Sequence, residues 1–171
     1  MLIKKSLKNL ILIFLVIIYS CERDQPVFGE NGMVVSTSSQ ASQVGIDIMK
    51  AGGNAIDAAA AVGFALAVTS SSNGNIGGGG FMTVKLENGN SFTLDYREMA
   101  PKAASRNMYL DREGNVIKGK SRYTHFAAGV PGSVDGLLKA WRDYGSGNIS
   151  REQLLNPAIN LAENGFKLSK Y

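Results

Sequence analysis

Apolar residues recur at helical spacing along much of the chain and predict five helices. The first starts at Ser38 or Ser39, either of which can cap it, and stops at Gly52-Gly53, because glycine readily ends a helix. Ser133 and Ser150 are the expected N-terminal caps of two later helices, the second within a capping-box pattern. The other four predicted helices cover residues 55–69, 102–110, 133–144 and 151–164.

The predicted helix over residues 55–69, AIDAAAAVGFALAVT, is apolar on nearly every side. A helix of this kind is buried in a protein core or crosses a membrane. Its 15 residues are too few to span a bilayer. We therefore predict a central core helix, whose small side chains let neighbouring elements approach closely.

Strand-like alternation of apolar and polar residues appears on both sides of Asn88-Gly89 and predicts a β-hairpin. A further short strand is predicted over residues 33–36. The residues expected to share one face of the hairpin are Met82, Val84 and Leu86 on its first strand, and Phe92, Leu94 and Tyr96 on its second.

Four consecutive glycines, Gly77 to Gly80, lead into this hairpin, and Arg97 follows it. Glycine lets another backbone or a ligand come close because it has no Cβ, and a guanidinium presents a rigid fork of donors that suits a carboxylate. Two plainer interpretations stay open. The glycine run can be a flexible loop without a ligand, and Arg97 can form a surface ion pair with Asp95 or Glu98. By residue type alone, the ion pair is the commoner outcome for such an arginine.

Composition narrows the function classes. The chain has 171 residues, of which 44% are hydrophobic and 19% charged, which indicates one globular domain. Three lysines in residues 1–20 account for most of the net charge of +4, and the remaining residues hold 15 basic and 14 acidic side chains. There is no basic cluster with interleaved aromatic residues, so we expect no nucleic-acid partner.

Neither a metal nor another cofactor is predicted. A single cysteine, Cys21, and a single histidine, His125, exclude multi-cysteine and histidine-rich metal sites within this chain. The glycine run matches neither the G-x-G-x-x-G fingerprint nor a P-loop. The residue types leave a Ser/His/Asp triad open, but the chain has no G-x-S-x-G elbow, and a structural role for His125 is favoured.

The N-terminus is typical of an exported protein. Residues 1–20 combine a basic start with a ten-residue apolar run, which predicts a signal peptide. The junction Ile18-Tyr19-Ser20-Cys21 resembles a bacterial lipoprotein signal, which implies cleavage before Cys21, lipid on that residue and a location in the periplasm or cell envelope, anchored to a membrane. A plain signal peptide or an uncleaved anchor is the alternative. Residues 21–32 are polar and predict a tether, so the folded domain is expected over residues 33–171.

Four blocks of sequence form a combination that is far more specific than any one of them. They are AGGNAIDAA at residues 51–59, GNIGGGGFM at 74–82, DYREMAP at 95–101 and GVPG at 129–132. In this order they resemble the N-terminal part of the large subunit of the γ-glutamyltranspeptidase family. The resemblance covers residues 33–171.

The resemblance implies an α+β fold, the N-terminal-nucleophile hydrolase αββα sandwich, of which this chain is an incomplete, N-terminal portion. Members of the family are made as one precursor that cuts itself into a large and a small subunit. The threonine freed at the start of the small subunit attacks a γ-glutamyl amide, as in glutathione, with its own α-amine as base. Water, an amino acid or a peptide then accepts the glutamyl group.

Within this chain the resemblance assigns one substrate-binding residue. Arg97 is similar to the arginine that holds the α-carboxylate of the γ-glutamyl group, and no catalytic residue is assigned. The threonine belongs to the small subunit, so the 171 residues alone are expected to be inactive. Two alternatives remain: an amidase of the same family similar to a cephalosporin acylase, and a non-catalytic lipoprotein remnant of a truncated gene.

Overall fold

The computed structural model describes residues 26–73 and 76–168. The chain divides into two units, Met1–Met33 and Val34–Tyr171, and the described part of the first contains no helix or strand. The predicted signal peptide, Cys21 and the start of the predicted tether lie outside the described residues. Among the described residues, no helix has both the length and the apolar character needed to cross a membrane.

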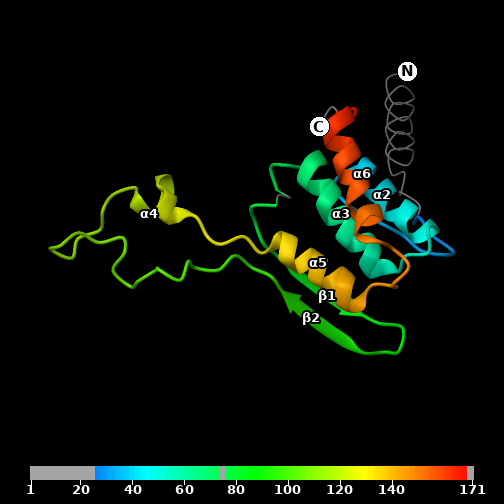
Figure 1. The fold of residues 1–171 in the computed structure, drawn as a ribbon, viewed down its shortest axis with the longest axis horizontal. Helices are drawn as coiled ribbons and strands as arrows, with labels where there is room; N and C mark the ends of the chain where they lie inside the picture. The colour runs from blue at the N-terminus through cyan, green and yellow to red at the C-terminus, as the bar shows by residue number, and fades with distance from the viewer. Residues whose placement is uncertain (1–25, 74–75, 169–171) are drawn as a thin grey trace, which may run out of the picture. The chain divides into compact units, whose positions relative to one another are not determined.

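The second unit combines helices with one two-stranded antiparallel sheet among its described residues (Figure 1). The helix α3 contacts three other helices, α2, α5 and α6, and α5 in turn contacts the strand β2. In chain order the elements are α2 (Ser39–Lys50), α3 (Ala55–Thr69), β1 (Phe81–Lys85), β2 (Ser91–Asp95), α4 (Lys120–Tyr123), the 3-10 helix η1 (His125–Ala127), α5 (Ser133–Tyr144) and α6 (Arg151–Asn164).

The helix α3 is the centre of the core, as its sequence predicts. Asn54 caps it by accepting hydrogen bonds from the N–H groups of Ile56 and Asp57, and the Asp57 carboxylate accepts one from the Asn54 N–H in return. Glycine allows the close approach to α5, because a Cβ at Gly63 would lie 2.8 Å from the Leu137 side chain. The buried residues of α3 are Ile56, Asp57, Ala58, Ala60, Ala61, Val62, Phe64 and Ala65.

The predicted hairpin is confirmed. Met82 pairs with Leu94 and Val84 with Phe92, and these four side chains are half-buried on one face while their neighbours along both strands are exposed. Gly89 has a φ of 87°, which explains why glycine stands in the turn. One side of the hairpin packs on the helices through the Phe92 ring, whose centroid lies 4.1 Å from that of Tyr144 in α5.

Two predicted elements are wrong, and each lacks the neighbour that its predicted structure would need. Residues 33–36 form no strand, because a strand needs a neighbour for its hydrogen bonds, and Val34 instead packs beside Gly45 of α2. Residues 102–110 form successive turns closed by bonds such as Ala104 N–H to the Pro101 carbonyl, rather than a helix. A short helix without a buried face does not recover its nucleation cost, and no residue from 99 to 131 is buried.

The start of α5 also differs from the prediction. Gly132 is the residue before the helix, and Ser133 is its first helical residue rather than its cap. The N–H groups of both residues donate to the Gly78 carbonyl, at 2.9 and 3.0 Å. A long-range contact with the glycine run therefore takes the place of a side-chain cap.

Candidate functional site

Arg97 lies where three backbone segments cross just beyond the end of β2. Tyr96 and Gly80 exchange two backbone hydrogen bonds, of 3.0 and 3.3 Å, which extend the hairpin ladder by one pair. The Gly78 carbonyl accepts the two N–H groups at the start of α5. The Met99 and Val130 backbones exchange two more bonds, of 3.1 and 2.8 Å. Three of the sequence blocks, GGGG, DYREMAP and GVPG, thus meet at one point.

The glycines at this crossing are required by space. A Cβ at Gly79 would lie 2.6 Å from both the Tyr96 carbonyl oxygen and the Glu98 nitrogen. A Cβ at Gly132 would overlap the same Tyr96 oxygen. Real Cβ atoms do not approach backbone so closely, so only glycine fits. Gly78 to Gly80 are therefore built into backbone contacts, and the interpretation of them as a flexible loop is wrong.

The Tyr96 ring anchors the backbone directly before Arg97. The ring lies against Gly80, where a Cβ would come within 2.9 Å of it, and against Gly136 of α5, where a Cβ would overlap it. This burial raises the pKa of the Tyr96 phenol above its ordinary value. The backbone that carries Arg97 is consequently held from both sides.

The Arg97 side chain is open to solvent, with 61% of its surface exposed. Its Nε donates to Oε2 of Glu98 at 3.1 Å, and its Cζ lies 5.8 Å from the centroid of the Phe81 ring. Among residues 26–73 and 76–168, the guanidinium makes no hydrogen bond besides this one through Nε. The two terminal nitrogens, Nη1 and Nη2, form the side of the fork that can bind a carboxylate with two parallel hydrogen bonds.

The Glu98 carboxylate is stabilised in its ionised form. Its pKa lies below the ordinary value, first because of a hydrogen bond from its own backbone N–H and next because of the bond from Arg97. Glu98 also borders a hollow of about 210 Å³, whose other walls include Gly63, Gly79 and Leu137.

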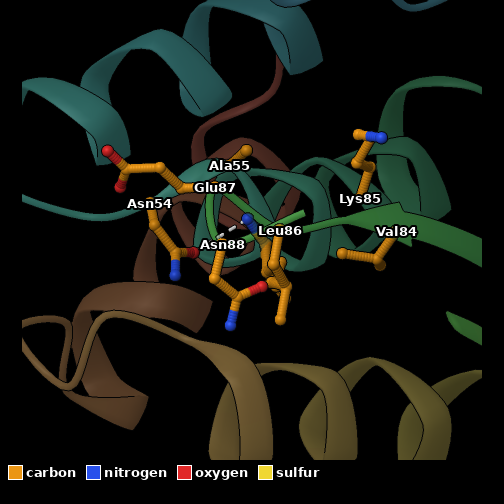
Figure 2. Close-up of a pocket in the computed structure, with 8 residues that line it drawn as sticks. Asn54, Ala55, Val84, Lys85, Leu86, Glu87 and Asn88 are labelled. Atoms are coloured by element: carbon orange, nitrogen blue, oxygen red, sulfur yellow. Dashed lines mark hydrogen bonds between the residues drawn. The ribbon is translucent and has the colours of Figure 1, made fainter. Parts of the chain in front are cut away.

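A larger hollow, of about 660 Å³, lies at the opposite end of the hairpin, between its turn and the start of α3 (Figure 2). Two of its polar side chains have structural roles. Asn54 caps α3 and also donates to the Tyr144 carbonyl, while Oδ1 of Asn88 accepts the Asn90 N–H within the turn. The lining also includes the side chains of Lys85 and Glu87, but it contains no guanidinium of the kind that Arg97 presents.

The described residues show no triad and no metal cluster. His125 is exposed, and its ring stacks on Phe126 with centroids 4.2 Å apart; among these residues it has no hydrogen bond to a serine or an aspartate. A structural His125 was expected, yet the side chain is not part of the core. In the same residues, no group of three or more His, Cys, Asp or Glu side chains could hold a metal ion.

A sequence profile of the Gamma-glutamyltranspeptidase family matches residues 41–171. This chain belongs to that family. The match includes all four sequence blocks and every helix and strand from α3 onward.

Individual relatives agree with the family assignment. The chain is 56% identical over 145 residues to a glutathione hydrolase proenzyme of Pseudomonas sp. (strain A14), in an alignment of 85% of this chain and 25% of the relative. The crystal structure of Helicobacter pylori γ-glutamyltranspeptidase superposes with a TM-score of 0.79 at 46% identity, over 85% of this chain and 41% of that one. The cephalosporin acylase of Bacillus halodurans superposes with a TM-score of 0.72 at 32% identity, over 87% and 27% of the two chains.

These comparisons confirm both the family and the fold class. This γ-glutamyltranspeptidase family chain has the α+β N-terminal-nucleophile hydrolase fold in part, and its relatives are enzymes. The chain spans about a quarter of the length of the curated relatives it matches.

The surface ion pair between Arg97 and Glu98, one of the two partners that the sequence offered, is present in the structure. The sequence analysis gave Phe81 no role beside Arg97. The signal for Phe81 was the register of the predicted hairpin, in which Phe81 pairs with Asp95 at the same end of the sheet as Arg97. The pairing of Phe81 with Asp95 depends on how the two strands align about the Asn88-Gly89 turn.

Proposed function

We propose that this chain is the part of a γ-glutamyltransferase that binds the α-carboxylate of γ-glutamyl substrates such as glutathione, through Arg97. The observation that carries the proposal is the open side of the guanidinium, on a backbone held where three segments cross, two of which contain glycine. One fixed cation orients the substrate so that its distal amide meets the nucleophile in a reproducible position.

The remaining chemistry is proposed to come from polypeptide outside these 171 residues. A threonine at the start of a self-cleaved small subunit attacks the amide carbon, and its α-amine takes the proton. The leaving amine departs and a glutamyl ester forms, which water, an amino acid or a peptide then resolves. The residues of this chain bind and orient the glutamyl group, and the proposed reaction uses no cofactor.

Replacing Arg97 by lysine tests the assignment. The charge is kept but the fork is lost, so substrate binding is expected to weaken by about 1.5–3 kcal/mol, a rise in KM of about 10- to 150-fold. The measurement is the KM for a γ-glutamyl anilide in a full-length enzyme. That enzyme is the longer protein containing this chain, or a chimera in which the chain replaces the matching quarter of the Pseudomonas sp. relative.

The matched control for this test is Arg112→Lys, in an exposed turn away from the crossing. It is expected to leave KM unchanged. An Arg97→Lys enzyme with the KM of the parent would contradict the assigned role.

A cephalosporin-acylase-like amidase is the second candidate, favoured by the similarity to the Bacillus halodurans structure. The higher identity to γ-glutamyl enzymes supports the first candidate. The two differ in what they hydrolyse. We expect the full-length enzyme to prefer a γ-glutamyl anilide over a cephalosporin amide, and the opposite preference would favour the acylase.

We also propose that residues 1–20 direct export to the periplasm or cell envelope and that lipid is attached at Cys21. Cys21→Ala is expected to abolish the incorporation of labelled palmitate in cells and to release the protein from the membrane fraction. Ser20→Ala keeps a small residue before the cysteine and should still be labelled. Equal labelling of the Cys21→Ala variant and the parent would rule out lipidation at this residue.

A further inference from the structure

The two carboxylates beside Arg97 do different things. Oδ1 of Asp95 accepts the backbone N–H of Arg97 at 3.0 Å, so it shapes the bend at the end of β2. Oε2 of Glu98 instead accepts the side-chain Nε at 3.1 Å. Of these two carboxylates, only that of Glu98 therefore acts on the orientation of the guanidinium.

Glu98 is itself held by its surroundings. Its nitrogen lies against Gly79, and a Cβ at Gly129 would lie 3.1 Å from the Glu98 Cβ. The next residue, Met99, is fixed by its pair of backbone bonds to Val130. These contacts set the position of the Glu98 backbone, from which its carboxylate reaches the Nε of the more exposed arginine.

The ion pair between Arg97 and Glu98 contributes little to the stability of the fold. The two side chains are 61% and 36% exposed, and ion pairs in such places add little stability. An arginine side chain free in solvent has many rotamers, which a substrate must reduce to one on binding. A bond through Nε removes much of that freedom beforehand and leaves Nη1 and Nη2 for the ligand.

We infer that Glu98 is a positioning residue for Arg97: its carboxylate holds Nε so that the two terminal nitrogens face the α-carboxylate of the γ-glutamyl substrate. The inference rests on the proposed role of Arg97. The Phe81 ring limits the guanidinium on a further side, with its centroid 5.8 Å from Cζ.

The test compares Glu98→Gln, Arg97→Lys and the double variant in the full-length enzyme. Glu98→Gln removes the charge while keeping the size of the side chain, and it is expected to raise KM for a γ-glutamyl anilide about 3- to 10-fold with kcat nearly unchanged. In the double variant KM should be no more than about twofold above that of Arg97→Lys alone, because the residue that Glu98 orients has already lost its fork. Glu98→Ala should raise KM at least as much as Glu98→Gln does.

The outcomes separate the two claims. An unchanged KM in Arg97→Lys removes the proposed function and this inference together. If Arg97→Lys raises KM while Glu98→Gln and Glu98→Ala do not, the proposed function stands and the inference is overturned. Fully multiplicative effects in the double variant, or a fall in kcat and melting temperature without a rise in KM, would show that Glu98 is only structural. Glu113→Gln, an exposed carboxylate elsewhere in the chain, is the matched control and should leave KM unchanged.

Discussion

The isolated 171-residue chain is expected to release no aniline from a γ-glutamyl anilide above the rate in buffer. Beside Arg97, the described residues at the crossing present two carboxylates, those of Asp95 and Glu98. Acyl transfer also requires a nucleophile within hydrogen-bond reach of a base, and these residues bring no such pair together. His125, the single histidine, stacks on Phe126 instead of meeting a serine.

The assay is to be made on protein whose circular dichroism retains the helical signal, so that a missing activity is not simply unfolding. The full-length enzyme, assayed beside it at the same concentration, should be active. Turnover by the isolated chain that rises in proportion to its concentration would show that the chain carries a nucleophile of its own. The proposed division of labour would then be wrong.

The second large effect is expected from Gly132→Ala. The added methyl group overlaps the Tyr96 carbonyl oxygen. Moving the Gly132 backbone would break its bond to Gly78, and moving the Tyr96 backbone would break its bonds to Gly80. Overpacking against backbone is expected to destabilise the fold by about 3–5 kcal/mol. For a chain of this size that corresponds to a fall in melting temperature of about 6–20 °C, measured by thermal unfolding.

Gly114→Asn is the matched control for this prediction. Gly114 also requires a special backbone, with a φ of 87°, but no atom lies within 4 Å of a Cβ placed there. Asparagine tolerates a left-handed conformation, so the control is expected to change the melting temperature little. Equal melting temperatures for Gly132→Ala and the parent would mean that the crossing is looser than the contacts indicate.

Much of the fold followed from local patterns. The Ser38 cap of α2, the apolar residues on nearly every side of α3 and the Asn88-Gly89 turn each determine their element from residues close together in the chain. The hairpin alternation likewise places Arg97 at the end of a strand. These features could be predicted because the interactions that stabilise them are made within a few residues.

Other features depended on residues far apart in the chain. Residues 33–36 and 102–110 have suitable composition, but neither segment found a partner that would stabilise a strand or a helix. The side chain of Ser133 could have capped α5, yet in the structure Ser133 is the first helical residue and its N–H donates to the Gly78 carbonyl. In each case a distant contact, or its absence, outweighed the local preference.

The site likewise combines features set by nearby residues with features set by distant contacts. The order of the motif blocks was sufficient to single out Arg97 and to place the chain in its family. Which carboxylate meets the guanidinium, and why Gly79 and Gly132 must be glycine, depends on three segments spread over more than fifty residues coming together at one crossing. Side-chain orientation and close backbone approach are set by packing in three dimensions, and neither leaves a periodic signal in the sequence.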